Sequence, residues 1–262
     1  MPLSRTQRQR LVEIARGRAA EPLRLLEGRK AVLDALALGV VRELYLATDL
    51  APEAGTALEA QAQRAGLVAR EVAAGELGRL SATVTPQGVL AVVSDTAEPL
   101  ARLLQRPGVL VWLDGVQDPG NVGAVVRVAA AFGAAGLLVG AGSADPLGLK
   151  ALRASAGLAL RLPFARAQAA AIAAGLASAP DAARRPVWLL EKGGRDVFEV
   201  SGAPADLVLV LGSEGGGLSP AARAAASGSV GVSIRPEVES LNAAVAMGLV
   251  LGVLTRRAAP RR

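Results

Sequence analysis

Three polar clusters in the second half of the chain carry the side chains that could do chemistry. The first is DPGNVGAVVRVA, which follows the apolar run VLVWL at 109–113 and contains Asn121 and Arg127. Arg127 falls inside an expected helix among apolar residues, where a guanidinium is costly unless it meets a carboxylate or a phosphate. Asn121 would cap that helix, whose free N–H groups favour an anion. The cluster predicts a site for an anionic partner; a paired arginine in an ordinary strand–turn–helix is the alternative.

The second cluster is the glycine-rich segment VLVLGSEGGGLSP at 208–220, in which a strand runs into Gly212, Ser213 and Glu214. Consecutive glycines let a ligand approach the backbone closely. The segment is not a phosphate-binding P-loop, because no Gly-Lys-Ser/Thr follows, and the acidic Glu214 favours pairing with a cation. A flexible loop without a site is the alternative.

The third cluster is VSIRPEVESLNAAVAMGLVL at 232–251, where a strand enters a loop and a helix follows. Ser240 would cap a helix that begins at Leu241 and Asn242, so Ser240 and Asn242 would both face the loop. Capping explains only one of these two side chains, and the pair therefore points to a site.

A nicotinamide or other dinucleotide site has little support. The segment GAAGLLVGAG at 133–142 lacks the third glycine of the Rossmann fingerprint, and Asp145-Pro146 interrupts the start of the next helix. The glycine-rich signature of Rossmann methyltransferases is missing as well.

The chain of 262 residues contains no Cys and no His, which excludes thiol nucleophiles, imidazole bases, zinc fingers and Ser-His-Asp triads. Proton transfer must then use a carboxylate, Lys, Arg, Tyr, water or the substrate, and we expect no metal. The lack of Cys also fits a reducing compartment. The N-terminus does not resemble a signal peptide and no apolar stretch is long enough to span a membrane, so we expect a cytoplasmic protein.

The formal charge of +6 favours a polyanionic partner such as nucleic acid, though only weakly. Much of the positive charge lies near the two ends, in residues 1–20 and at Arg256, Arg257, Arg261 and Arg262. Solvated basic tails and RNA-binding arms both account for this distribution.

Apolar runs and helical periodicity alternate along the chain, which predicts an α/β protein with a parallel sheet covered on both faces in its second half. The three polar clusters follow expected strands, so they should converge at the carboxyl ends of the strands, where such sheets bind ligands. A polar segment near 96–106 predicts a boundary between two domains, 1–98 and 105–262, and residues 1–20 of the first domain are expected to form a basic arm. The expected strands are 41–47, 67–72, 88–94, 109–113, 136–140, 159–163, 186–190, 207–211 and 230–234, and the expected helices are 27–38, 52–65, 121–132, 146–155, 167–178, 219–226 and 240–256.

In this order, the three clusters resemble motifs of the SpoU/TrmH family of RNA ribose 2'-O-methyltransferases, within the SPOUT superfamily. The segments LDGVQDPGNVGAVVRVAAAFGA, LGSEGGGLS and VESLNAAVA are similar to its three motifs, and KALRASAGL is similar to a further family segment. The resemblance covers about residues 105–257. More weakly, LLEGRKAVLDAL and TPQGVLAVV resemble the ribosomal-protein-like RNA-binding domain that many members carry upstream.

The resemblance implies a C-terminal parallel-sheet SPOUT domain with a deep trefoil knot that holds S-adenosylmethionine, a smaller N-terminal α/β domain that binds RNA, and a homodimer whose active site draws on both subunits. By position, it assigns the catalytic surface to Asn121, Arg127, Glu214, Ser240 and Asn242. It assigns the cofactor pocket to Gly212, Ser213, Glu214, Gly217, Ile234, Ser240, Leu241 and Asn242. The chain departs from the third motif where Ser233 replaces a proline and Pro236 replaces a glycine.

The implied reaction moves a methyl group from a sulfonium to a ribose 2'-oxygen. A guanidinium stays protonated, so we expect Arg127 to clamp an RNA phosphate and stabilise the developing alkoxide, while phosphate or water takes the proton. The expected substrate is 23S ribosomal RNA. The alternatives are a transfer RNA methyltransferase and a non-catalytic RNA-binding or ribosome-assembly factor on the same fold.

Overall fold

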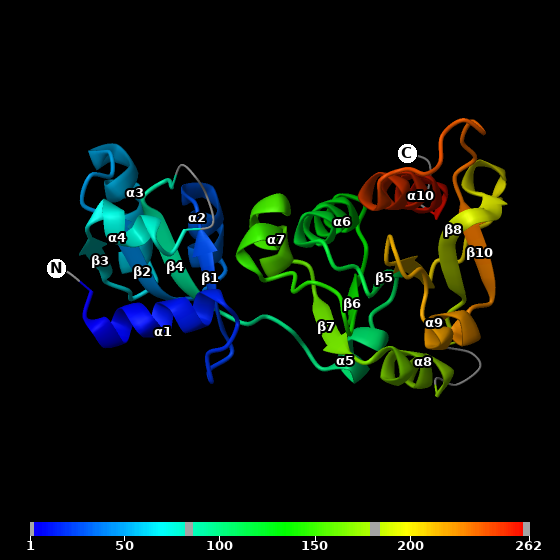
Figure 1. The fold of residues 1–262 in the computed structure, drawn as a ribbon, viewed down its shortest axis with the longest axis horizontal. Coiled ribbons are helices and arrows are strands. Elements are labelled where there is room, and N and C mark those ends of the chain that lie inside the picture. Colours follow the sequence, from blue (N-terminus) through cyan, green and yellow to red (C-terminus); the bar gives the residue numbers. More distant parts are fainter. Residues whose placement is uncertain (1–2, 82–85, 179–183, 259–262) are drawn as a thin grey trace. The chain divides into compact units, whose positions relative to one another are not determined.

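The computed structural model describes residues 3–81, 86–178 and 184–258 (Figure 1). It divides into two compact units. The N-terminal unit comprises Met1–Thr96 and Leu147–Leu160, and the C-terminal unit comprises Ala97–Pro146 and Arg161–Arg262.

The N-terminal unit is built on a four-stranded sheet with the order β1-β4-β2-β3. Strand β4 (Val89–Ser94) pairs antiparallel with β1 (Leu23–Glu27) and β2 (Val41–Ala47), and β2 pairs parallel with β3 (Ala69–Val72). Its helical segments are α1 (Arg5–Ala15), α2 (Arg29–Ala37), α3 (Pro52–Arg64), α4 (Ala74–Gly78), α7 (Leu149–Ala154) and the 3₁₀ turn η1 (Leu158–Leu160). This arrangement confirms the prediction of a smaller α/β domain at the N-terminus.

Helix α1 corrects the expectation that residues 1–20 form a basic arm. Leu11 and Ile14, three residues apart on one face of α1, are buried in the core of the N-terminal unit. Two of the three arginines of α1 form ion pairs within the unit: Arg8 pairs with Glu76, and Arg10 with Glu21 and Glu43. The helix was not predicted, because the many Arg residues of this segment mask the helical spacing of Leu11 and Ile14. At the other end of the chain, Arg261 and Arg262 lie outside the described residues.

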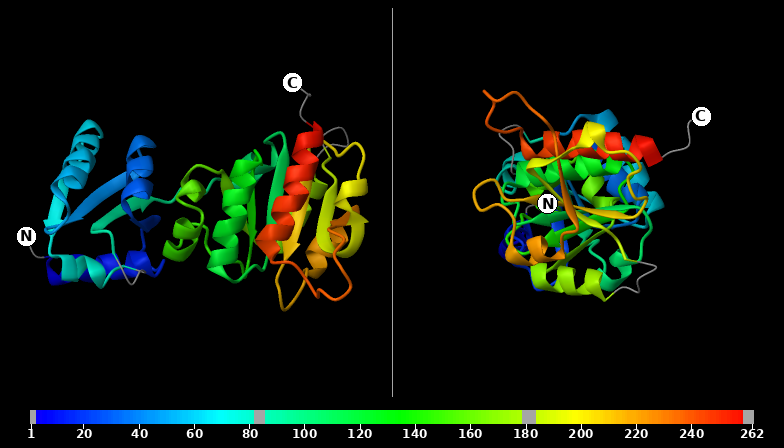
Figure 2. Two further views of the ribbon diagram at one scale, coloured as in Figure 1. Left: turned by 90° about the horizontal axis from the view of Figure 1, so that it is seen from above. Right: turned by 90° about the vertical axis from the view of Figure 1, so that its right-hand side faces the viewer.

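The C-terminal unit contains a six-stranded sheet with the order β10-β8-β9-β5-β6-β7, in which every pairing is parallel. Helices α6 and α10 lie side by side on one face of the sheet, and α5, α8 and α9 lie on the other (Figures 1 and 2). The predicted doubly covered parallel sheet is confirmed. The strands are β5 (Val109–Asp114), β6 (Gly136–Gly140), β7 (Phe164–Ala167), β8 (Val187–Asp196), β9 (Leu207–Gly212) and β10 (Gly228–Gly231), and the helices are α5 (Leu100–Leu104), α6 (Pro119–Ala131), α8 (Ala169–Ala177), α9 (Pro220–Ala225) and α10 (Ala243–Ala258), with the 3₁₀ turn η3 (Val197–Glu199).

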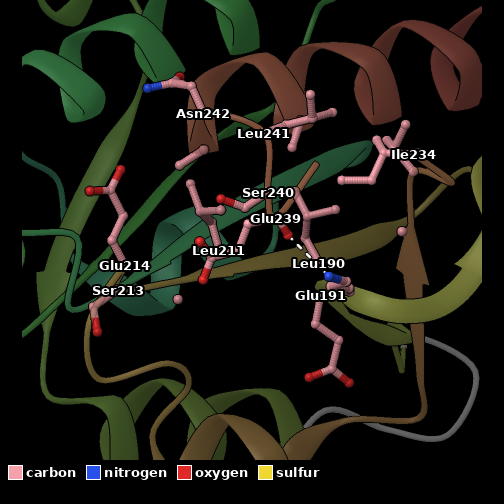
Figure 3. Close-up of a pocket in the computed structure, with 16 residues that line it drawn as sticks. Leu190, Glu191, Leu211, Ser213, Glu214, Ile234, Glu239, Ser240, Leu241 and Asn242 are labelled. Atoms are coloured by element: carbon pink, nitrogen blue, oxygen red, sulfur yellow. Dashed lines mark hydrogen bonds between the residues drawn. The ribbon is translucent and has the colours of Figure 1, made fainter. Parts of the chain in front are cut away.

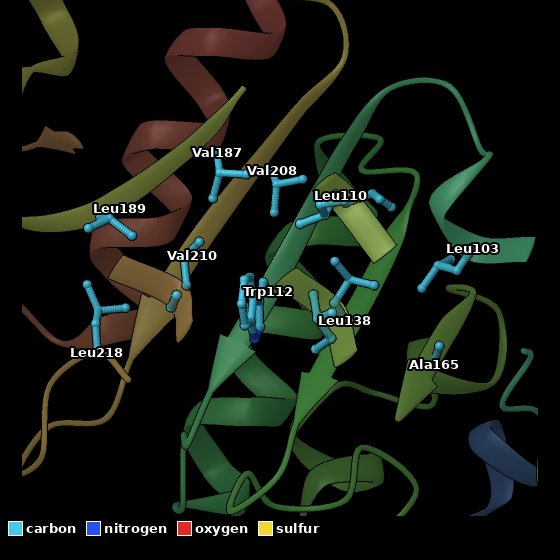
Figure 4. Packing of buried hydrophobic residues seen from close by; sticks show 13 residues of the cluster. Leu103, Leu110, Trp112, Leu138, Ala165, Val187, Leu189, Val208, Val210 and Leu218 are labelled. Atoms are coloured by element: carbon cyan, nitrogen blue, oxygen red, sulfur yellow. The ribbon is translucent and has the colours of Figure 1, made fainter. Parts of the chain in front are cut away.

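Trp112 lies at the centre of the core beneath α5, α8 and α9 (Figure 4). It is fully buried and surrounded by side chains of the neighbouring strands, including Leu138 and Val210. The apolar runs that predicted the central strands therefore form a rigid base, and the polar loops emerge from its carboxyl edge.

Some predicted boundaries were wrong for local reasons. The strand expected at 159–163 is a 3₁₀ turn followed by β7, because Pro163 has no N–H to give to a ladder. The helix expected from residue 27 begins at Arg29, after Gly28 adopts φ +101°. Helix α5 occupies the segment expected to be a polar linker, because Leu100, Leu103 and Leu104 pack on the core at helical spacing.

Candidate active site

The loop after β5 is held by two polar side chains. The buried carboxylate of Asp114, the last residue of β5, accepts a hydrogen bond from the Ser219 N–H at 2.6 Å. The Ser143 hydroxyl oxygen accepts hydrogen bonds from the N–H groups of Gly115 and Val116, at 3.0 and 3.1 Å. These bonds fix the start of the loop that carries the first polar cluster.

Asp118, and not Asn121, caps helix α6. The Asp118 carboxylate accepts a hydrogen bond from the backbone N–H of Asn121 at 3.0 Å. The predicted cap at Asn121 is wrong because α6 begins two residues earlier, at Pro119, a residue well suited to a first helical turn. The side chain of Asn121 is thereby left available for other partners.

The glycine-rich loop after β9 is a closed turn. Ser213 and Gly217 exchange backbone hydrogen bonds, each N–H to the other carbonyl, at 3.0 Å. Gly217 has a φ of +66°, and a Cβ on Gly212 would lie 2.7 Å from the Gly217 carbonyl oxygen. Only glycine fits at these two positions, and the turn that they allow presents Glu214 at its tip.

Asn242 caps helix α10. Its side-chain oxygen accepts the N–H groups of Ala244 and Val245 at 2.9 and 3.3 Å. The predicted cap at Ser240 is wrong, since α10 begins at Ala243 and not at Leu241. Ser240 and Leu241 belong instead to the segment that leads into the helix.

The three clusters meet in a chain of side-chain hydrogen bonds. The Asn242 amide nitrogen donates to Asn121 Oδ1 at 3.0 Å, and the Asn121 amide nitrogen donates to Glu214 Oε1 at 2.7 Å. Because each amide donates through nitrogen and accepts through oxygen, the network fixes the orientation of both. A carboxylate is thereby aimed and held by the first turns of two helices.

A cavity of about 490 Å³ opens beside this chain and is called the main cavity below (Figure 3). It is lined by the ends of β8, β9 and β10 and by the segment before α10. The lining residues are Leu190, Glu191, Lys192, Leu211, Gly212, Ser213, Glu214, Gly231, Val232, Ile234, Glu239, Ser240, Leu241, Asn242, Ala243 and Ala246. A second cavity of about 380 Å³ shares Gly212, Ser213 and Glu214 and includes Asn121, so Glu214 lies between the two.

Most of the predicted site residues meet at the main cavity. Gly212, Ser213, Glu214, Ile234, Ser240, Leu241 and Asn242 line it, and Asn121 touches it through Asn242. Gly217 lines neither of the two cavities; it closes the turn that carries Glu214.

Arg127 lies elsewhere. It is exposed, lines neither cavity, and forms no hydrogen bond or ion pair with any residue that the structure describes. The expectation of an arginine enclosed by apolar residues is wrong, because successive helical residues are rotated by about 100°, so a residue six positions after Asn121 points to another side of α6.

Sequence reasoning missed the contribution of β8. Leu190, Glu191 and Lys192 line the main cavity. The polar segment EKGGRD at 191–196, directly after the strand expected at 186–190, was the signal that was passed over. The rule that ligands lie beyond the carboxyl ends of parallel strands could have identified them. Among the residues that the structure describes, no group of acidic side chains could hold a metal ion, and no helix is long and apolar enough to cross a membrane.

Comparisons with known proteins agree with these motifs. Residues 108–252 match the SpoU rRNA Methylase family model, and residues 25–99 match the RNA 2'-O ribose methyltransferase substrate binding model. A Mycobacterium bovis protein named as an uncharacterized tRNA/rRNA methyltransferase is 37% identical over 238 residues, 88% of this chain and 73% of that protein.

Two solved structures share the fold of the whole chain. The AdoMet-bound rRNA methyltransferase from Sinorhizobium meliloti has a TM-score of 0.83 at 25% identity, over 98% of this chain and 97% of that one. The SpoU methyltransferase AviRb from Streptomyces viridochromogenes, in complex with AdoMet, has a TM-score of 0.82 at 26% identity, over 97% of this chain and 98% of that one. With a family model that covers more than half of its length, the chain belongs to the SpoU rRNA methylase family and is an RNA methyltransferase.

Proposed function

We propose that this protein uses S-adenosylmethionine to methylate a ribose 2'-hydroxyl in structured RNA, with 23S ribosomal RNA as the expected substrate. The observation that carries the proposal is the chain from Asn242 through Asn121 to Glu214 at the edge of the main cavity. It orients a carboxylate through two side-chain amides, in a chain that contains no histidine. Transfer RNA is the second substrate class to test, since relatives carry names that include both RNAs.

The main cavity suits the proposed cofactor. Leu190, Leu211, Ile234 and Leu241 supply apolar walls for a purine, and the backbone near Gly212 is open to close approach. When bound, S-adenosylmethionine supplies a methyl group already activated by its positive sulfur. The acidic Glu214 faces this site, where a cation is favoured over a phosphate.

The protein's own task is to make a weakly acidic hydroxyl attack in line and to hold it in place. Glu214, oriented by Asn121, would accept a hydrogen bond from the ribose and set its angle. Arg127 would clamp a neighbouring phosphate and stabilise the negative charge that develops on the oxygen, while phosphate or water takes the proton. In this mechanism Arg127 stays protonated throughout the reaction.

Arg127 would serve the cavity of a second copy of the chain. It lies outside its own main cavity, on α6, which packs beside α10. Apolar side chains are exposed at the end of α6 and on α10: Phe132 is 37% exposed, Val245 53% and Leu249 39%. Exposed apolar side chains on two adjacent helices are typical of an interface. We therefore propose a two-fold dimer through α6 and α10, which brings Arg127 of one protomer to the site of its partner.

Mixed dimers test this arrangement. Arg127→Ala and Glu214→Gln variants, each inactive alone, would be unfolded and refolded together. If Arg127 acts in the partner's site, each mixed dimer has one complete site, and a random mixture regains about a quarter of the wild-type activity. If Arg127 acts in its own subunit, the mixture stays inactive.

The N-terminal unit would supply affinity for RNA. Arg29 and Lys30 are exposed at the first turn of α2, which carries no acidic residue. With aromatic residues at only 2% of the chain, contacts to phosphate and 2'-hydroxyl groups are favoured over base stacking. The trefoil knot, the domain limits 1–98 and 105–262, and a cytoplasmic location stay predictions.

A substrate panel tests the function. Labelled S-adenosylmethionine would be supplied with unmodified transcripts of 23S, 16S and transfer RNA, and with assembled ribosomal subunits. Label in 23S RNA or its subunit is expected. Cofactor binding without label in any RNA would overturn the enzymatic proposal and favour the non-catalytic factor; label in transfer RNA alone would correct the substrate.

A further inference from the structure

The segment that joins β10 to α10, residues 232–242, forms one wall of the main cavity without any helix or strand of its own. Its last residue is fixed through Asn242 and Asn121. Its preceding part is held from the opposite side: the Lys192 ammonium donates to the carbonyl oxygen of Glu239 at 3.1 Å (Figure 3, dashed line). The stretch Glu239–Asn242 is thus suspended between β8 and α6.

Lys192 is carried by a bulge in β8. The register with β10 passes directly from Ser229↔Leu189 to Val230↔Arg195, so residues 190–194 form an unpaired protrusion in that ladder. Bulges of this kind re-aim side chains beside functional sites. The protrusion reaches the wall of the main cavity and points Lys192 at the neighbouring segment.

The backbone of the bulge is tightly fixed against β10. A Cβ on Gly194 would lie 2.7 Å from the carbonyl carbon of Val230, and a Cβ on Gly231 would lie 2.6 Å from the Glu191 carbonyl oxygen. Gly193 has a φ of +83°. Only glycine allows so close an approach, so Lys192 extends from a rigid base.

The same strand holds the other end of the segment. Hydrogen bonds from the Ser233 side chain, and then from the Phe198 and Ser233 backbone N–H groups, lower the pKa of the Asp196 carboxyl. A proline at position 233 could offer neither the hydroxyl nor the N–H. The serine in place of the family's proline therefore gives this chain a tie between β8 and the segment.

We propose that Lys192 is a positioning residue for the cofactor. By holding the Glu239 carbonyl, it fixes the backbone of Ser240 and Leu241 in the conformation that binds the cofactor. This lowers the entropic cost of ordering this wall when the cofactor binds. The proposal rests on the proposed use of the main cavity for S-adenosylmethionine. Lys192 takes no part in the methyl transfer itself.

The test compares Lys192→Met, Lys192→Arg and Arg195→Met. Arg195 is a matched control, because it lies on the same strand, is exposed, and donates to a backbone carbonyl, that of Glu199, at the same 3.1 Å but outside the main cavity. Calorimetry would measure the Kd for S-adenosylmethionine, and hydrogen exchange would report on the amides of residues 239–241. Steady-state kinetics would separate KM for the cofactor from kcat.

Lys192→Met should weaken cofactor binding about threefold to tenfold, the range for one hydrogen bond, and speed exchange at residues 239–241, with kcat nearly unchanged. Lys192→Arg should restore both values, and Arg195→Met should change neither. Binding within twofold of wild type in Lys192→Met, or an equal loss in Arg195→Met, would overturn the proposal. If the wild-type protein binds no cofactor, the proposed function fails, while the exchange rates still decide whether Lys192 holds the segment.

Discussion

The amide nitrogen of Asn121 lies 2.7 Å from Glu214 Oε1, although the two residues are 93 positions apart. They meet because β5 and β9 are neighbours whose last residues, Asp114 and Gly212, are paired in register. The loops that follow both strands therefore start from the same point on the sheet edge. The order of the parallel strands therefore determines, through this bond, the direction in which the Glu214 carboxylate points.

Replacing Asn121 by Asp should convert this bond into a repulsion. The Asn242 amide could still donate to residue 121, but Glu214 would face a second carboxylate at hydrogen-bond distance. We expect methyl transfer near neutral pH to fall by about a hundredfold, the effect of a small misplacement in a site. Activity should partly return at lower pH, because a close carboxylate pair binds a shared proton with a raised pKa.

Asn121→Ala is the control, since it removes the bond without adding charge. It should lose activity without the recovery at lower pH, as measured by pH–rate profiles at saturating RNA and cofactor. Wild-type turnover in Asn121→Asp at neutral pH would show that the direction of Glu214 does not matter.

Arg127→Ala should reduce kcat by about a hundredfold to a thousandfold, as the loss of a donor to a developing oxyanion does. The Kd for S-adenosylmethionine should stay nearly unchanged, because Arg127 lines no part of the main cavity. Arg127→Lys should also be poor, since the planar fork is lost. Because Arg127 is exposed, the melting temperature of Arg127→Ala should be close to that of the wild type. A single-turnover rate near the wild-type value in this variant would show that Arg127 takes no part in the reaction.

RNA binding should weaken steeply as salt rises, since phosphate contacts release counterions. Arg29→Ala combined with Lys30→Ala should lower the slope of log K against log salt by about one for each RNA phosphate that is no longer neutralised. Arg18→Ala provides a comparison, because Arg18 is already paired with Glu13. A filter-binding titration that gave the same slope for the wild type and both variants would place the RNA-binding surface elsewhere.

The single tyrosine allows a direct spectroscopic test of the N-terminal unit. Burial, with the hydrogen bond from the Tyr45 hydroxyl to Glu43, raises the pKa of Tyr45 from 10.0 to about 12. At a pH between 10 and about 12, the folded protein therefore keeps the phenolic proton of Tyr45, while the unfolded chain loses it. The stabilisation is present below about pH 10 and is lost towards pH 12, a loss of about 3 kcal/mol in the free energy of unfolding.

Absorbance at the tyrosinate band, followed with pH in folded protein, measures this directly. Tyr45→Phe should abolish the absorbance change and the loss of stability over this range. Half-ionisation near pH 10, with circular dichroism still native, would contradict the burial of Tyr45 and its hydrogen bond to Glu43.

The sequence allowed the central strands of both sheets and the meeting of three loops to be predicted, because apolar runs report burial and parallel strands share one carboxyl edge. Strand β1, at the edge of the first sheet, was missed. The caps were predicted wrongly, because Asp118 and Asn121, or Ser240 and Asn242, are equally good cap formers. For α6, Pro119 at the first helical position was a sequence signal that favoured Asp118. The role of β8 could be predicted only in part. Its polar end follows from the strand-end rule, but the direction in which Lys192 points depends on the register between β8 and β10, which the sequence alone does not give.

The chemical identity of the methylated nucleotide tests the proposed reaction most directly. RNA labelled by the wild-type enzyme would be digested to nucleosides and, in parallel, treated with alkali. We expect label in one 2'-O-methylnucleoside and one phosphodiester that has become resistant to alkali. Label in a methylated base, with every phosphodiester still cleaved, would contradict the proposed reaction, because the proposed site holds a ribose hydroxyl against the methyl donor.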